Sequence, residues 1–189
     1  MRPSILRMTR LLAGALLVAG CSTRIEPEAR TTPADTSAVL ARLVPATAAD
    51  VLARVRGSNA KATLVNVWAT WCGPCREEFP GMLDVARAHR ADGLRTLLVS
   101  ADFDDAKPAI ARFLAGQSVG DTTFLKVGDD QSFIDSLSAH WSGALPATFV
   151  YDRSGRLVTS WEGRADRTRF ESAVTRALAA PTSSGGSTP

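Results

Sequence analysis

The sequence predicts an α/β fold, and three features of the 189-residue chain indicate it. A near-continuous apolar run from Thr63 to Ala69 is typical of a central strand that is covered on both faces. A helical segment, Cys72 to Ala91, follows almost directly, and Leu94 to Ser100 forms a second apolar strand. Further on, two strand-like runs flank Asp152 to Gly155, a turn sequence typical of a β-hairpin.

The same patterns place the other elements in order. In the helix after the first strand, the apolar residues recur every three or four positions and form one face, Phe79, Met82, Leu83 and Ala86. Further helices are expected at Ala48–Val55, Ala106–Ala115 and Ser132–Ala139, and the hairpin strands at Ala147–Tyr151 and Arg156–Trp161. The last helix is predicted from Asp166 or Thr168 to Ala180, with Thr168 and Glu171 as a capping box.

The motif Trp71-Cys72-Gly73-Pro74-Cys75 lies where the first strand ends and the helix begins. Two thiols at this spacing share one helix face and can form a small disulfide ring. The free N–H groups and the dipole of the helix start stabilise the thiolate of Cys72, which is therefore the predicted nucleophile. Cys75, one turn further on, is the predicted resolving thiol. A zinc site is the alternative, but zinc needs about four ligands and only His89 and His140 remain.

The longer segment from Leu64 to Pro80 resembles the TlpA/ResA-like branch of the thioredoxin superfamily. The resemblance covers Val44 to Ala180 and is strongest at the cysteine motif and at Gly143 to Phe149. It implies a thioredoxin-like fold, in which helices flank a central mixed sheet. It also implies an extracytoplasmic, membrane-tethered thiol–disulfide oxidoreductase whose redox group is the Cys72–Cys75 disulfide, without a separate cofactor.

The resemblance assigns roles to several further residues. Pro146 is expected to be a cis-proline that faces the cysteines, with an ordinary loop proline as the alternative. The backbone of Leu145 is then expected to pair with a substrate chain. Glu78 corresponds to an acidic residue that influences proton transfer in ResA-like relatives, although a solvated helix glutamate is equally compatible with the sequence. Trp71 is expected to line the substrate platform. Asn66 replaces the buried aspartate that cytosolic thioredoxins usually carry.

The N-terminus reads as a secretion signal. Three arginines precede the short apolar core Leu11 to Ala19, which is too short to span a bilayer. The core ends at Cys21 in a sequence that resembles a bacterial lipobox, so residues 1–20 are predicted to be a lipoprotein signal peptide and Cys21 to carry lipid. An ordinary signal peptide with an incidental cysteine is the alternative. Residues 21–43 are predicted to be a tether, 44–180 the folded domain and 181–189 a disordered tail.

Cysteine usage and charge narrow the function. The chain has three cysteines, so lipidation of Cys21 leaves one pair and no structural disulfide. Removal of the three signal-peptide arginines balances 19 basic against 19 acidic residues, which gives no support for nucleic-acid binding. The expected partners are therefore protein thiols and disulfides, the membrane through lipidated Cys21, and a membrane electron donor.

Several functions remain open from the sequence. A reductase that supports cytochrome c or metal-site maturation is favoured, because Gly-Pro between the cysteines matches reducing thioredoxins; oxidase and isomerase are alternatives. A peroxidase is disfavoured, since the Pro-x-x-x-Thr/Ser-x-x-Cys arrangement of peroxiredoxins is replaced by Val65 and Ala69. A lipid-anchored copper-binding protein of the same fold is the non-enzymatic alternative.

Overall fold

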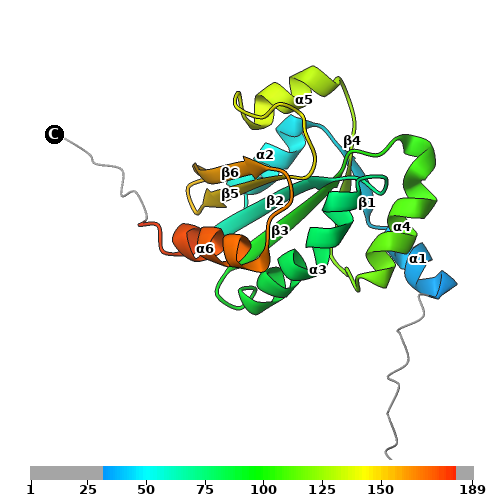
Figure 1. The fold of residues 1–189 in the computed structure, drawn as a ribbon, viewed down its shortest axis with the longest axis horizontal. Coiled ribbons are helices and arrows are strands. Elements are labelled where there is room, and N and C mark those ends of the chain that lie inside the picture. Colours follow the sequence, from blue (N-terminus) through cyan, green and yellow to red (C-terminus); the bar gives the residue numbers. More distant parts are fainter. Residues whose placement is uncertain (1–31, 182–189) are drawn as a thin grey trace, which may run out of the picture.

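A six-stranded mixed sheet forms the centre of the molecule, whose computed structural model describes residues 32–181 (Figure 1). The strand order is β1-β4-β3-β2-β5-β6. The strands are β1 (Leu43–Ala46), β2 (Ala62–Trp68), β3 (Leu94–Ser100), β4 (Thr123–Lys126), β5 (Ala147–Asp152) and β6 (Leu157–Glu162). The first four are mutually parallel, and β5 and β6 run antiparallel to their neighbours. The predicted α/β architecture with a mixed sheet is confirmed.

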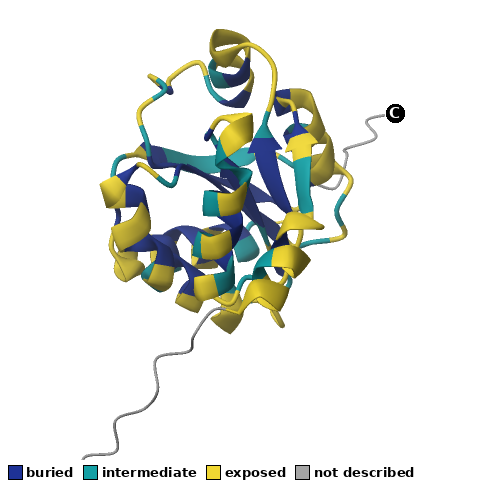
Figure 2. Ribbon diagram, turned by 90° about the vertical axis from the view of Figure 1, so that its right-hand side faces the viewer, coloured by how far each residue is buried: buried dark blue, intermediate teal, exposed yellow. Residues whose placement is uncertain are grey.

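Helices cover both faces of the sheet (Figures 1 and 2). They are α1 (Pro33–Leu40), α2 (Ala48–Arg56), α3 (Gly73–Ala88), α4 (Lys107–Gly116), α5 (Asp130–Leu137) and α6 (Arg167–Leu178), with a 3-10 turn η1 (Asp104–Ala106). Helices α1, α3, α4 and α6 contribute to one apolar core, and α2 and α5 to the other. All seven residues of β2 are buried because β2 lies between both layers, as its continuous apolar sequence predicts.

Three short elements at one side of the sheet escape sequence-based prediction. Strands β1 and β4 have only four residues each and pair with each other, and β1 contains Pro45, which an edge strand tolerates. Helix α1 packs against α4 and buries Val39. Residues 33–43, which the sequence assigns to the tether, are therefore part of the folded structure.

The start of α6 also differs from expectation. Asp166 is the N-cap, and its carboxylate accepts a hydrogen bond from the Arg169 N–H at 2.9 Å. Glu171 does not complete a capping box with Thr168. It lies instead 2.6 Å from His89 Nε2 and links α6 to the end of α3. Asp166 outcompetes Thr168 because a carboxylate caps a helix start at least as well as a hydroxyl.

An aromatic cluster supports the beginning of α3. Trp68, Phe79 and Phe113 come from β2, α3 and α4, and their ring centroids are 4.9 to 5.0 Å apart. Trp68 and Phe79 have no exposed surface. Because Trp68 ends β2 and Phe79 lies one turn after Cys75, this cluster fixes the strand-to-helix connection that carries the cysteines.

The expectations for the signal peptide, lipidated Cys21, residues 21–31 of the tether and residues 182–189 of the tail lie outside the described residues. Within residues 32–181, no helix combines the length and the apolar character that a membrane crossing requires.

Candidate active site

The two cysteines of the motif lie at the N-terminus of α3, directly beyond the end of β2. Cys72 is the N-cap residue and has an extended backbone (φ −83°, ψ 102°). Pro74 occupies the first turn of α3, where a backbone N–H would have no hydrogen-bond partner within the helix, so its missing N–H costs nothing. The N–H of Cys75 donates a hydrogen bond to Cys72 Sγ at 3.2 Å. The sulfur thus takes the position of the side-chain oxygen in an ordinary N-cap.

The cysteines form a disulfide, with their Cα atoms 5.3 Å apart. Cys75 is fully buried, and Cys72 keeps 6% of its surface exposed. A substrate sulfur can therefore approach Cys72 but not Cys75, which is the order of events that the sequence predicts for nucleophile and resolving thiol. Gly73 has no atom within 4 Å of the place where a Cβ would lie, so this side of the disulfide is open.

Pro146 lies on the neighbouring strand end, and its peptide bond to Leu145 is cis, as expected. Ala147 pairs with Val67 in the antiparallel β2–β5 ladder. Continuing this register places Pro146 beside the last residue of β2, at the same sheet edge as the disulfide. Its carbonyl accepts a hydrogen bond from the Gly163 N–H at 2.8 Å.

The loop before Pro146 is fixed at several points. The indole N–H of Trp141 donates to the Ala144 carbonyl at 2.9 Å, and the Ser142 N–H donates to a carboxylate oxygen of Glu162 at 2.7 Å. Gly143 has φ 89°, a conformation that glycine adopts readily and other residues rarely, and a Cβ there would lie 2.7 Å from a methyl carbon of Ile134. Leu145 and Pro146 are consequently presented by a constrained backbone.

Glu78 is buried behind the cysteines, on the turn of α3 that follows Cys75. Its carboxylate accepts hydrogen bonds from the Asn66 side chain at 3.0 Å and from the Ala165 N–H at 2.9 Å. Asn66 also donates to Thr148 Oγ1 at 3.0 Å. The interpretation of Glu78 as a solvated helix residue is therefore wrong, and the Asn66 substitution acquires a role as its hydrogen-bond donor.

Asp102, in the loop that follows β3, is a buried hydrogen-bond acceptor at the same end of the sheet as the disulfide. It is 4% exposed. Its carboxylate accepts from the Thr70 N–H at 2.9 Å, the Thr70 hydroxyl at 2.6 Å and the Ser100 hydroxyl at 2.7 Å. These bonds join the loop that follows β3 to the loop that leads into Cys72. The long sequence separation of Thr70 and Asp102 left no local signal for this contact.

Neither histidine completes a metal site with the cysteines. Both ring nitrogens of His89 are engaged, Nδ1 with Asp92 at 2.8 Å and Nε2 with Glu171 at 2.6 Å. His140 is exposed on the loop after α5. Among the residues that the structure describes, no three His, Cys, Asp or Glu side chains are grouped to hold a metal ion.

Comparison with protein-family models gives a match over residues 47–160 to the AhpC/TSA family. The match covers more than half of the sequence. The chain belongs to the AhpC/TSA family. The matched range begins at the N-cap of α2 and includes the cysteine motif, Glu78, Asp102 and Pro146.

Curated relatives of this AhpC/TSA-family chain include the thiol:disulfide interchange protein HelX of Rhodobacter capsulatus, which is 30% identical over 106 residues. The thiol-disulfide oxidoreductase ResA of Bacillus subtilis is 28% identical over 98 residues. These matches cover 56% and 52% of the chain. They span only about half of the relatives, 54% of HelX and 51% of ResA.

Solved structures confirm the predicted thioredoxin-like fold. A thiol:disulfide interchange protein of the thioredoxin family from Chlorobium tepidum superposes with a TM-score of 0.55 at 26% identity, covering 67% of this chain and 83% of that one. A thioredoxin-related protein from Neisseria meningitidis gives 0.55 and 26%, covering 65% and 89%.

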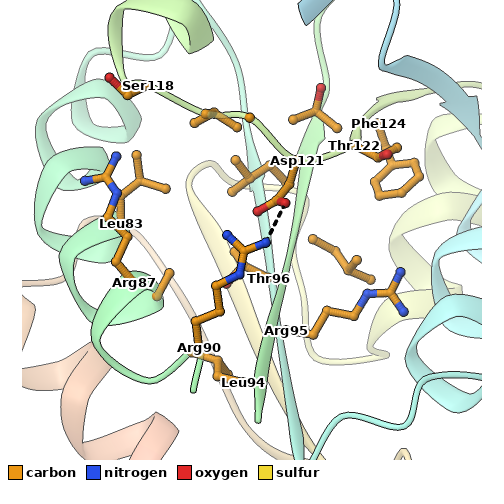
Figure 3. Close-up of a pocket in the computed structure, with 16 residues that line it drawn as sticks. Leu83, Arg87, Arg90, Leu94, Arg95, Thr96, Ser118, Asp121, Thr122 and Phe124 are labelled. Atoms are coloured by element: carbon orange, nitrogen blue, oxygen red, sulfur yellow. Dashed lines mark hydrogen bonds and ion pairs between the residues drawn. The ribbon is translucent and has the colours of Figure 1, made fainter. Parts of the chain in front are cut away.

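The structure of this chain also contains a cavity of about 500 Å³, which lies away from the cysteines (Figure 3). It is lined by the N-terminal part of β3, the end of α3 and residues 118–124, at the end of the sheet opposite to Cys72. Its arginines do not converge on one point. Arg90 pairs with Asp121 at 3.0 Å, and the guanidinium groups of Arg87 and Arg95 point away from each other. The cavity therefore lacks the convergent polar groups of a ligand site.

The buried Glu78 carboxyl predicts that the stability of the fold depends on pH. Burial raises the pKa of the Glu78 carboxyl above its ordinary value, and the hydrogen bonds from Ala165 and Asn66 offset this in part. The folded state therefore holds the Glu78 proton more tightly than the unfolded state. We expect the free energy of unfolding to fall as the pH rises from the ordinary glutamate pKa through the raised one.

Glu78→Gln removes this titration, and we expect the variant to lose the corresponding decline and to be at least as stable as the parent at neutral pH. A glutamine fits at this position because Asn66 Oδ1 is buried without a partner in the described residues. After rotation of the Asn66 side-chain amide, this oxygen can accept a hydrogen bond from the amide of the new glutamine. Urea unfolding at several pH values measures the effect. Glu77→Gln is the matched control, since Glu77 is exposed. Identical pH profiles for parent and Glu78→Gln would contradict the expectation.

Proposed function

We propose that this chain is a thiol–disulfide oxidoreductase that exchanges disulfides with protein substrates through Cys72 and Cys75. The observation that carries the proposal is the disulfide at the start of α3, of which only Cys72 is accessible. The cis bond before Pro146 at the same sheet edge and the activities for which HelX and ResA are named support it further.

The reduction of a substrate proceeds in two exchanges. The Cys72 thiolate attacks one sulfur of the substrate disulfide, whose other sulfur leaves as a thiolate, and a mixed disulfide forms. The Cys75 thiolate then attacks Cys72 Sγ and displaces the first substrate sulfur. Two electrons pass to the substrate, which leaves as a dithiol after taking up two protons, and the Cys72–Cys75 disulfide is formed.

The first turn of α3 supports the attacking group. The Cys75 N–H that reaches Cys72 Sγ at 3.2 Å stabilises negative charge on that sulfur, as do the other free N–H groups of the helix start. A lower-energy thiolate at Cys72 also makes it the better leaving group when Cys75 attacks. Leu145 offers its backbone beside this point, where an extended substrate segment can pair with it.

The finer proposal is a reductase tethered to a membrane outside the cytoplasm. The lipobox-like sequence ending at Cys21 supports lipid anchoring, and the Gly-Pro pair between the cysteines supports the reducing direction. Such a reductase needs a membrane electron donor to regenerate its dithiol. Apocytochrome c and metal-site assembly factors are the substrates that the resemblance suggests.

Two competing functions have less support. A peroxidase would need a threonine or serine three residues before the nucleophile, and Ala69 stands there, buried and without a hydroxyl. A copper-binding protein would use Cys72 and Cys75 with a third ligand, and His89 is held by two carboxylates instead. Oxidase and isomerase use the same residues and differ in reduction potential.

The reduction potential of the Cys72–Cys75 pair decides the direction. We expect a value near that of thioredoxin, about −270 mV, for the chain without residues 1–21, equilibrated in glutathione or dithiothreitol redox buffers. Trapping of free thiols with a mass tag reports the oxidised fraction. A value near −120 mV would make the protein an oxidant, and a chain that forms no intramolecular disulfide would contradict the redox function altogether.

A further inference from the structure

Two aromatic side chains stand out on the surface. Of the large hydrophobic residues in the described part of the chain, four are exposed, and they differ widely in degree. Phe103 is 80% exposed and Trp71 66%, whereas Leu40 and Val127 are 38% and 36% exposed. Single exposed apolar residues are common on protein surfaces. Two strongly exposed aromatic residues at the same end of a sheet indicate a surface that binds another molecule.

Phe103 and Trp71 lie in adjacent loops at the edge that carries the disulfide. Strands β2 and β3 are parallel, and their last residues, Trp68 and Ser100, pair with each other. The Ala101 N–H still donates to the Trp68 carbonyl at 2.7 Å, so the two chain segments leave the sheet side by side. Cys72 follows on one of these segments, and Phe103 on the other.

The buried Asp102 carboxylate joins the two loops that carry the aromatic residues. Asp102 directly precedes Phe103 and accepts two hydrogen bonds from Thr70, which directly precedes Trp71. The Phe103 carbonyl accepts from the Ala106 N–H at 3.0 Å in the turn η1. The carbonyl of Phe103 and the side chain of the preceding residue are thus both hydrogen-bonded, and the exposed Phe103 ring extends from a constrained loop.

The strand order places Phe103 and Pro146 on opposite sides of the disulfide. In the sheet, β2 lies between β3 and β5. The end of β2 leads to Cys72, the end of β3 leads to Phe103, and the start of β5 follows Pro146. A substrate segment that pairs with Leu145 and reaches Cys72 has Phe103 ahead of it on the far side.

We propose that Phe103, whose loop is bonded to the loop of the expected platform residue Trp71, contacts the polypeptide whose disulfide reacts with Cys72. The fitting partner carries an apolar side chain near its reacting cysteine, on the side away from Leu145. Burying the Phe103 ring under that side chain removes apolar surface from water and favours the encounter complex. This inference rests on the proposed thiol–disulfide exchange and adds a residue that selects protein substrates over small disulfides.

Insulin is a suitable protein probe, because reduction of its disulfides by dithiothreitol is followed by turbidity. We expect Phe103→Ser to lower the rate of catalysed insulin reduction about tenfold, the size of one lost apolar contact. The direct reaction of the oxidised protein with dithiothreitol and the reduction potential should stay unchanged. Leu40→Ser, an exposed apolar position on α1, is the matched control and should match the parent in all three measurements.

Three results would contradict the inference. In the first, the Phe103→Ser variant reduces insulin at the parental rate. In the second, it reacts more slowly with insulin and with dithiothreitol by the same factor, so that the substitution acts on the disulfide and not on a polypeptide contact. Insulin could also go unreduced by a parent protein that reacts normally with dithiothreitol, so that no polypeptide contact exists. A parent that lacks exchange with dithiothreitol as well would mark a failure of the proposed function itself.

Discussion

Replacing Cys72 with serine is expected to abolish disulfide exchange, whereas Cys75→Ser should stop the reaction halfway. A serine hydroxyl is not ionised near neutral pH and forms no disulfide, so the first exchange has no nucleophile. In Cys75→Ser the sulfur of Cys72, a residue that keeps 6% of its surface accessible, still attacks, but the buried thiol that displaces the product is missing. Turnover is expected to fall below detection in both variants, and mass spectrometry should find the mixed disulfide with insulin chains only in Cys75→Ser.

Comparing the two serine variants distinguishes the role of Cys72 from that of Cys75. Serine is nearly the same size as cysteine, and in Cys72→Ser the new hydroxyl oxygen can cap α3 in place of the sulfur, so the fold should survive in both. The double variant is the control for non-specific adducts. A mixed disulfide that accumulates in Cys72→Ser and not in Cys75→Ser would reverse the assigned roles. Turnover that persists in Cys72→Ser would place the chemistry elsewhere in the chain.

The cysteine motif and the longer strands were predictable from local sequence, and the cis-proline from the family resemblance. The apolar run of β2 is long enough to identify a fully buried strand, and the turn at Asp152 to Gly155 fixes the hairpin. The motif names Cys72 and Cys75 directly, and Pro146 was found through the family pattern around it. In each case the decisive residues are close together in the sequence.

The parts that escaped prediction depend on contacts between distant residues. Strands β1 and β4 have four residues each and become strands only because β1 pairs with β4 and β4 pairs with β3. The local sequence around Asp102 gives no sign that its side chain is buried. Only the parallel pairing of β2 with β3 brings Thr70 within reach of it. Glu78 remained ambiguous because its donor, the Ala165 N–H, is 87 positions away.

These distant contacts share one consequence for the site. The chain segments that surround the disulfide are each bonded to a distant segment. Thr70 is bonded to Asp102 after β3, Ser142 to Glu162 at the end of β6, and α3, through Glu78, to Ala165 in the loop before α6. Sequence shows which atoms react, and the tertiary hydrogen bonds hold those atoms in a defined arrangement. Variants that loosen these bonds should therefore affect the site before they affect the rest of the fold.

The aromatic cluster beneath the site is expected to carry the largest single contribution to stability. Phe79→Ala removes a fully buried ring whose centroid lies 4.9 Å from that of Trp68 and 5.0 Å from that of Phe113. The cavity left behind and the lost apolar burial should lower the free energy of unfolding by about 4 kcal/mol. That is a large fraction of the roughly 5–15 kcal/mol that a typical domain has.

Phe103→Ala is the matched control, because it removes the same ring from a position that is 80% exposed. Its free energy of unfolding should stay within about 0.5 kcal/mol of the parent value. Urea unfolding followed by tryptophan fluorescence measures both variants. A loss below about 1 kcal/mol in Phe79→Ala would mean that α3 closes over the vacated space and that the cluster does not hold the cysteine-bearing turn in place. The expected pair of results would instead show that the buried Phe79 ring supports the site and that the exposed Phe103 ring contributes little to folding stability.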